Sequence, residues 1–207
     1  MEQTRGRDKA KRNIVLFVIG VFLTFIATVL TSVGTATGIT WLAFFGFLAL
    51  VGSVLEIIAI VLLRNVNKKY ANALWALIFN FLIVLTIAIL TGISVFQEGN
   101  ESLDNAANWL QLAADLTESL IVVYFVFGTN QLAEENGKGM PILTKGVVYG
   151  YMGIFAFALV LKILNFIPAI SENTTVTAVF GIIVIVLYVI RTICYVFFLI
   201  RSLWRVK

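Results

Sequence analysis

This 207-residue chain contains no histidine, a single cysteine and only two prolines. Without histidine it cannot form a histidine-ligated zinc or haem site, a metalloprotease helix or a catalytic triad that uses histidine as base. Cys194 has no second cysteine to pair with, which excludes an intramolecular disulfide and a CxxC redox motif. The P-loop and GxSxG motifs are also missing. We therefore expect a protein that is not an enzyme and that holds no metal or cofactor, although Asp, Glu, Lys and Tyr remain available for chemistry.

Charged residues are scarce as well, at 13% of the chain, against about a quarter in soluble domains. Apolar residues make up 60% and gather in six stretches. Each stretch is long enough, at about 1.5 Å per residue, to cross about 30 Å of hydrocarbon. The six stretches are Ile14–Val33, Ile39–Leu63, Ala73–Phe96, Asn105–Phe127, Gly146–Ile167 and Thr175–Ile200. The sequence predicts an all-α polytopic integral membrane protein, with residues 1–207 forming a single transmembrane helical domain.

The distribution of Lys and Arg predicts the topology. Thirteen of the 15 lie outside the apolar stretches, in four groups within residues 1–13, 64–69, 138–145 and 201–207. Six crossings place all four groups on one side, whereas five crossings, without the polar fourth stretch, would split them. Because positive charge is retained in the cytoplasm, we expect six helices in three hairpins, with cytoplasmic termini. The loops around Thr35, Gly99 and Ser171 are then external.

The charged segments suggest contacts but no nucleic acid partner. Residues 1–13 and 201–207 are predicted basic cytoplasmic tails, and the net charge of +4 is explained by topology and attraction to anionic lipid head groups. The Gly128–Lys145 loop is a candidate contact for a protein partner. The first apolar stretch is too long for a signal peptide and lacks a clear cleavage site, so we expect it to be retained. This feature and the single cysteine fit a prokaryotic plasma membrane.

The predicted hairpins span residues 12–64, 70–128 and 145–201. Their second helices each carry two polar residues three positions apart, which are Ser53 with Glu56, Asp115 with Glu118, and Tyr188 with Arg191. The pattern is compatible with a degenerate threefold repeat or with a chance alignment of apolar helices. No proline interrupts a predicted helix core, which argues against the broken helices of many transporters.

Polar residues also form a stripe along the fourth stretch. Asp104, Asn108, Gln111, Asp115 and Glu118 recur at spacings of 4, 3, 4 and 3 residues. On a helix of about 3.6 residues per turn, all five lie on one face. Because such groups are costly in lipid, this face must meet protein or water. In a transporter, Asp115 and Glu118 would hold a coupling ion or proton, and the other three would line an outward-facing cavity.

Several polar residues share one depth in the membrane. Glu56, Asn80, Glu118 and Arg191 lie eight to eleven residues from the basic ends of their stretches, which is roughly 12–16 Å and near the midplane. We expect these side chains to meet, with Arg191 bridging Glu56, Glu118 or both. With neighbours one turn away, the predicted polar layer comprises Glu56, Asn80, Asp115, Glu118, Tyr188 and Arg191. Lys162, nearer the outer boundary, is expected to snorkel outward.

Two functions remain open for this polar layer. Its three carboxylates outnumber its one arginine, so at least one acid must be protonated unless water or a cation enters. Such a layer suits a transporter or channel-like protein for an ion, a proton or a small solute. Alternatively, the layer is structural and fixes helix register in a non-catalytic membrane subunit, immunity protein or regulatory protein. A cavity reaching Glu118 from outside favours transport, and a dry, fully paired layer favours the structural role.

Overall fold

A computed structural model of the chain describes residues 2–97, 100–135, 137–164 and 174–206, and these residues are helical apart from short connections. No strand occurs within those ranges. The elements are α1 (Glu2–Thr37), the 3-10 helix η1 (Thr40–Phe45), α2 (Gly46–Leu63), α3 (Lys68–Phe96), α4 (Glu101–Glu134), α5 (Pro141–Leu164) and α7 (Thr174–Arg205). The prediction of an all-helical protein is confirmed.

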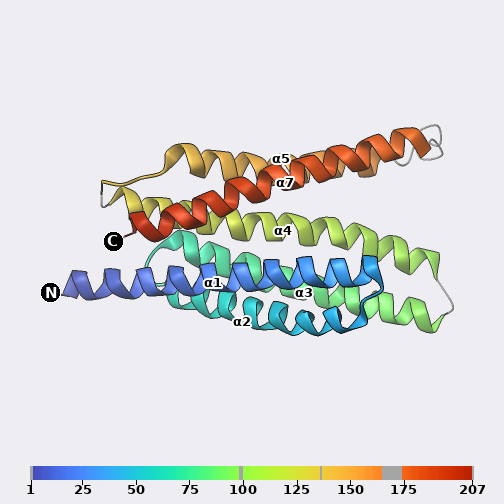
Figure 1. The fold of residues 1–207 in the computed structure, drawn as a ribbon, viewed down its shortest axis with the longest axis horizontal. Helices are drawn as coiled ribbons and strands as arrows, with labels where there is room; N and C mark the ends of the chain where they lie inside the picture. Colours follow the sequence, from blue (N-terminus) through green and yellow to red (C-terminus); the bar gives the residue numbers. More distant parts are fainter. Residues whose placement is uncertain (1, 98–99, 136, 165–173, 207) are drawn as a thin grey trace.

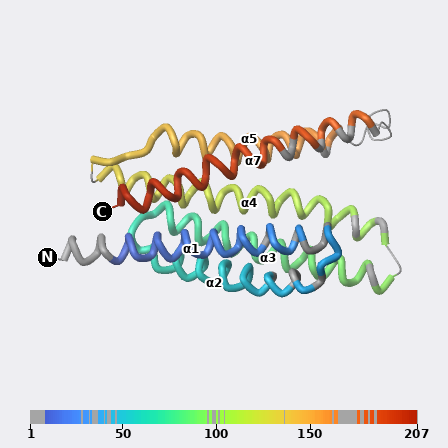
Figure 2. The backbone as a smooth tube through the Cα atoms, in the orientation of Figure 1, coloured from blue at the N-terminus to red at the C-terminus, as the bar shows by residue number. Residues whose placement is uncertain are grey.

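The helices pair as three antiparallel hairpins. The closest neighbours are α1 with α2 and α3 with α4, and α5 pairs with α7 as well as with α4. Figure 1 shows the four helices of the first two hairpins side by side, with the α5–α7 pair lying across α4. The tube in Figure 2 makes it plain that α1 begins and α7 ends at the same end of the molecule.

The described residues include five helical segments that are long and apolar enough to cross a membrane. These are Lys9–Thr31, Lys68–Ser94, Asn105–Glu134, Pro141–Leu161 and Val186–Arg205, and α2 contributes a shorter apolar segment, Phe47–Leu63. The outer surface is also apolar. Trp75, Phe79 and Phe81 on α3, for example, are each more than half exposed. An apolar surface that continuous would aggregate in water and is stable against lipid.

The helices run further than the apolar stretches do. The expected basic tail of residues 1–13 is helical from Glu2, and α7 continues to Arg205. Likewise, α4 extends to Glu134 and α5 starts at Pro141, so the expected loop of residues 128–145 is largely helical. Thr129 and Asn130 on this extension are buried. Hydrophobicity marks the depth of the bilayer, whereas Lys, Arg, Glu and Ala are good helix formers that continue a helix beyond it.

The second apolar stretch is not one continuous helix. Instead of a helix from Ile39 to Leu63, the structure has η1 over Thr40–Phe45 and α2 from Gly46. Gly38 precedes this turn with a φ of 71°, a left-handed conformation that glycine adopts without steric cost. The chain therefore reverses direction after α1 by a tight turn followed by 3-10 geometry, and α2 is the shortest of the described α-helices.

The core is concentrated at the end where the termini lie. There, the rings of Phe17 and Phe125 stack at 3.7 Å between centroids, and the buried Tyr70 hydroxyl hydrogen-bonds Thr129 at 3.0 Å. Of the described side chains, none on α5 beyond Ile154 and none on α7 before Arg191 is buried. The bundle is thus closed at one end, and α5 and α7 diverge from α4 toward the other (Figure 1).

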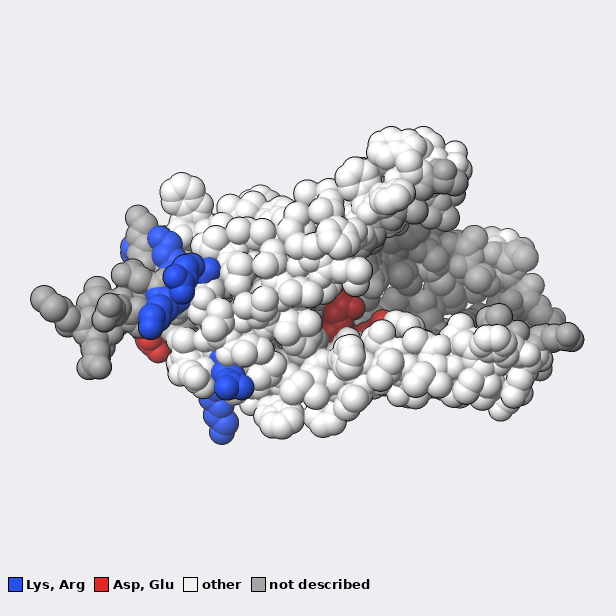
Figure 3. Space-filling view, turned by 90° about the horizontal axis from the view of Figure 1, so that it is seen from below, with Lys and Arg blue, Asp and Glu red and all other residues white. Residues whose placement is uncertain are grey.

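The charged side chains are also distributed unevenly along the length of the bundle. Figure 3 shows the Lys and Arg side chains gathered at the closed end, whereas most of the acidic atoms visible in this view lie near mid-length. The fold thereby joins the four basic groups into one polar end and places carboxylates near mid-length.

Candidate functional site

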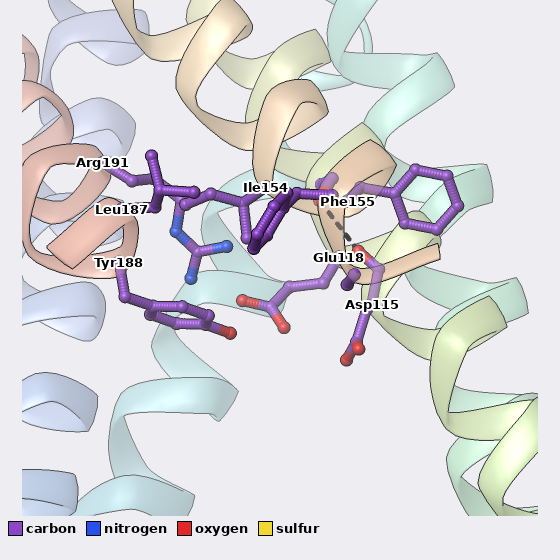
Figure 4. A pocket seen from close by; sticks show the side chains of 10 residues that line it. Asp115, Glu118, Ile154, Phe155, Leu187, Tyr188 and Arg191 are labelled. Carbon is purple, nitrogen blue, oxygen red and sulfur yellow. Dashed lines mark hydrogen bonds between the residues drawn. The ribbon is translucent and has the colours of Figure 1, made fainter. Parts of the chain in front are cut away.

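A cavity of about 170 Å³ lies among α4, α5 and α7, where the divergence of these helices begins. Its lining comprises Asp115, Glu118 and Ser119 from α4, Ile154, Phe155, Phe157 and Ala158 from α5, and Leu187, Tyr188 and Arg191 from α7. Four of the six residues predicted for the polar layer therefore meet in one cavity. Figure 4 shows the Arg191 guanidinium and the Glu118 carboxylate directed toward each other, with the Asp115 carboxylate beyond Glu118.

Arg191 is held by aromatic rings rather than by an ion pair. It is only 9% exposed, and its guanidinium carbon lies 4.2 Å from the ring centroid of Tyr151 and 4.0 Å from that of Tyr188. Both rings present their negative faces to the cation, which stabilises it in a site of low polarity. The Nε atom is buried and has no hydrogen-bond partner.

The prediction that Arg191 bridges to Glu56 or Glu118 is therefore wrong, in the sense that Arg191 forms no ion pair with either acid. Within the described ranges, no carboxylate oxygen lies within 4.0 Å of the guanidinium, although Arg191 and Glu118 are near enough to attract each other. The two tyrosine faces fix the plane of the guanidinium, and contact with a carboxylate would require it to leave them. Arg191 thus enters the cavity with hydrogen-bonding capacity that no carboxylate uses.

The two acids of the cavity have different surroundings. Both line the cavity, and Glu118 is exposed while Asp115 is half-buried one helical turn away. Asp115 accepts a hydrogen bond from Gln111 Nε2 at 3.0 Å, between residues four apart on α4. Ser119 donates to the backbone carbonyl oxygen of Asp115 at 2.8 Å. Glu118 is thus the acid nearest to the arginine, and Asp115 has only a neutral amide as side-chain donor.

Glu56 belongs to the contact between α1 and α2. Thr24 Oγ1 donates to Glu56 Oε1 at 3.0 Å, next to the place where Gly20 and Gly52 bring the two helices together. A Cβ atom added to Gly52 would lie 2.6 Å from the Gly20 carbonyl oxygen. Glu56 is near enough to Glu118 for the two acids to repel each other, but it does not line the cavity.

Asn80 is turned toward a different neighbour. Its Nδ2 atom donates to the carbonyl oxygen of Ala114 and to Oγ1 of Thr117, both at 2.9 Å. These bonds tie α3 to α4 on a side of α4 that does not face the cavity. The predicted layer therefore separates into the cavity group and two hydrogen-bonded contacts, each within one hairpin.

The outer part of the α4 stripe leads away from the cavity. Asn108 and Gln111 are exposed and do not belong to the cavity wall. The side chain of Asp104 lies outside the described residues, as does that of Lys162. The predicted lining by Asn108 and Gln111 is therefore not part of the cavity, and Gln111 is linked to it only through its hydrogen bond to Asp115.

Sequence reasoning did not identify the apolar wall of the cavity. Ile154, Phe155, Ala158 and Leu187 carry no signal that separates them from lipid-facing residues of the same helices. Tyr151 was not predicted either, because its contact with Arg191 depends on how α5 is rotated against α7. Ser119 could have been noticed as a small polar residue next to Glu118.

Comparison with known proteins gives no further guide to the site. No protein family, no characterised protein and no solved structure matches this chain. The described residues also contain no group of three or more acidic or cysteine side chains arranged to hold a metal ion. The chemistry of the cavity therefore rests on its own residues, and the chain is identified by its architecture as a helical membrane protein.

Proposed function

We propose that this protein is a small-solute transporter whose movement of solute is coupled to protonation of Glu118. The single observation that carries the proposal is the cavity near mid-length, which contains Glu118, Asp115 and an unpaired Arg191. Ionisable groups in a membrane are costly, and they are retained mainly on ion, proton and substrate pathways. The cavity lies where α5 and α7 begin to diverge from α4, and this divergence would supply the access such a pathway needs (Figure 1).

We infer six crossings with cytoplasmic termini for this transporter. The hairpin arrangement brings the basic groups to one end, and this supports their placement in the cytoplasm. Although the apolar segment of α2 is only 17 residues long, about 26 Å at 1.5 Å per residue, it is paired along its length with α1. The diverging end of the bundle would then face outward, in a prokaryotic plasma membrane as the sequence suggests.

A structural role is favoured for another part of the polar layer. Glu56 and Asn80 have hydrogen-bond partners within their own hairpins, as expected of groups that fix helix register. If the cavity group served the same purpose, Arg191 would be expected to pair with an acid. The alternative function is a non-catalytic membrane subunit, immunity protein or regulatory protein that binds a partner at the Gly128–Lys145 segment, and it is supported by the Glu56 and Asn80 contacts.

Proton-coupled uptake can be measured without knowing the solute. The purified protein is reconstituted into vesicles that contain a pH-sensitive dye, with an inward proton gradient. Amino acids, amines, monocarboxylates, sugars and monovalent cations are then added one class at a time. We expect at least one class to accelerate internal acidification. Glu118→Gln should remove this effect because the amide keeps the shape of the side chain and loses its titratable proton.

The control is Glu135→Gln, an exposed acid at the basic end of α4, which should behave like the unchanged protein. Solute-driven acidification that persists in Glu118→Gln would show that Glu118 is not the coupling group. If no solute class moves protons through the unchanged protein, the transporter proposal itself is wrong.

A further inference from the structure

We infer that the cavity binds a small zwitterion with an apolar body, such as a neutral amino acid, with its ammonium group at Asp115 and its carboxylate at Arg191. This inference rests on the proposed transport function and names the class of solute. It uses two independent features of the site, namely an acid without a cationic partner and a buried arginine without an anionic one.

The charges of the cavity are arranged in a row. Figure 4 places Glu118 between Arg191 and Asp115, and Glu118 is attracted by the first and repelled by the second. When Glu118 is protonated, one positive pole and one negative pole remain, and the cavity has no net charge. A zwitterion is the ligand whose two charges match this arrangement without leaving either pole unbalanced.

Arg191 supplies the anion-binding pole. It is 9% exposed and lines the cavity, with Tyr151 and Tyr188 against its faces. Stacking occupies the faces of a guanidinium but leaves its N–H donors free at the edge. A carboxylate of the ligand can accept two parallel hydrogen bonds from such an edge. The ammonium group of a lysine could not donate two bonds in this parallel geometry.

Asp115 supplies the cation-binding pole. Its carboxylate accepts from the neutral Gln111 amide at 3.0 Å, and that bond leaves its negative charge uncompensated. An ammonium group offers three N–H donors and a full positive charge. The position of Glu118 between the two poles makes its protonation part of binding, because a ligand carboxylate beside Arg191 would repel an ionised Glu118.

The remaining wall limits the rest of the ligand. Phe155, Phe157, Ala158 and Leu187 are apolar, so the part of the ligand between and beyond its charges should be hydrocarbon. The volume of about 170 Å³ is below the range of about 300–1,000 Å³ that is typical of pockets for drug-sized ligands. The ligand should therefore be a compact solute rather than a peptide.

Three probes of equal apolar body separate the charge requirements. Leucine carries both charges, leucine methyl ester at about pH 6 carries only the positive one because an α-amino group titrates near 8, and 4-methylpentanoate carries only the negative one. Binding to the detergent-solubilised protein is measured by calorimetry and by thermal stabilisation. We expect leucine to bind at least about tenfold more tightly than either single-charge analogue, since each lost contact is a charge-assisted hydrogen bond.

Variants of Asp115 and Arg191 test which residue binds the ammonium group of the ligand and which binds its carboxylate. Asp115→Asn should weaken leucine binding about tenfold or more and leave binding of 4-methylpentanoate nearly unchanged. Arg191→Lys retains the charge but loses the planar edge, and should weaken binding of leucine more than that of its ester. Glu135→Gln serves as the control for lost acidic charge. If Arg191→Lys fails to fold, the comparison of the three probes on the unchanged protein still decides the ligand class.

Equal or tighter binding of the methyl ester would overturn the inference in favour of a simple cation site, and tighter binding of 4-methylpentanoate would overturn it in favour of an anion site. If leucine neither binds nor accelerates acidification of vesicles while another solute class does so through Glu118, the zwitterion assignment is wrong and the transport function stands. If no class does so, both are wrong.

Discussion

Two buried tyrosines show how much a single hydroxyl group contributes to stability. The Tyr195 hydroxyl is buried without a hydrogen-bond partner, whereas the hydroxyl of Tyr70 bonds that of Thr129. An unsatisfied buried hydroxyl lowers stability by about 1–3 kcal/mol, and a satisfied one adds about 1 kcal/mol. The two side chains have the same shape and differ in whether the hydroxyl is hydrogen-bonded. Changing each tyrosine to phenylalanine should therefore have opposite effects on stability.

Tyr195→Phe should leave the melting temperature in detergent unchanged or raise it, because it removes only the unpaired polar atom. Tyr70→Phe should lower it by about 2–4 °C, which corresponds to about 1 kcal/mol for a chain of this size. Thermal unfolding of the two variants side by side measures the difference. A clear loss of stability in Tyr195→Phe would mean that its hydroxyl is bonded to an ordered water beneath the cavity.

The residues of the site also show what sequence reasoning can and cannot predict. Depth follows from counting residues along a helix, and it grouped Glu56, Asn80, Glu118 and Arg191, of which only Glu118 and Arg191 line the cavity. The direction of a side chain depends on how each helix is rotated in the bundle. Helices that are apolar nearly all round do not specify that rotation. Glu56 has the same depth but points to Thr24 on α1, and this could not be read from the chain.

At the scale of helices, the most sensitive contact is the crossing of α1 and α2. A Cβ atom on Gly20 would lie 2.7 Å from the Gly52 carbonyl oxygen, and one on Gly52 would lie 2.6 Å from the Gly20 carbonyl oxygen. Backbone atoms cannot rotate away as a side chain can. Small residues generally suit close packing of membrane helices, but the pairing of these two glycines depends on the register of the two helices.

Gly52→Ala should therefore force α1 and α2 apart and weaken the hydrogen bond from Thr24 to Glu56. Overpacking of this kind typically lowers stability by about 1–3 kcal/mol. Gly92→Ala on α3 is the matched control, because no atom lies within 4 Å of the added methyl group, and alanine favours a helix by up to about 1 kcal/mol. Comparable melting temperatures for the two variants would contradict the close crossing.

Helix existence was predictable because each apolar stretch is long, while helix ends were not. The basic residues before Ile14 were assigned to a tail on account of their charge, yet α1 begins at Glu2. Asn13 and Ala10 on that extension are buried, so tertiary packing stabilises the helix at these two positions. The 3-10 segment at Thr40–Phe45 likewise follows from the turn at Gly38 rather than from hydrophobicity.

At the scale of the whole molecule, closure at the basic end and divergence at the other end make the bundle asymmetric across the membrane. The closed end contains the aromatic contacts around Phe125, and the open end contains no buried described side chain on α5 or α7. A transporter in such a state exposes its site to one side only. Access to the α4 stripe should therefore differ between the two sides of the membrane.

This asymmetry predicts a pattern of chemical labelling. Single cysteines are introduced into a Cys194→Ser background and treated with a membrane-impermeant thiol reagent. In intact cells, Gln97→Cys at the outer end of α3 and Gln111→Cys on the stripe should react, because both positions are exposed on the open side. Lys138→Cys should react only after the membrane is permeabilised, since it lies at the basic end.

The decisive control is a residue of similar depth that faces lipid. Phe81 is 65% exposed on the outer surface of α3, so Phe81→Cys should not react from either side, because a thiol in hydrocarbon does not ionise and only the thiolate is reactive. Labelling of Gln111→Cys but not Phe81→Cys would mean that water follows the α4 stripe inward from outside, toward Asp115 and Glu118. Equal reactivity of Gln97→Cys and Lys138→Cys in intact cells would instead contradict the six-crossing topology. Protection of Gln111→Cys together with labelling of Gln97→Cys would leave the topology intact and show that the α4 stripe is closed to water, as a purely structural polar layer requires.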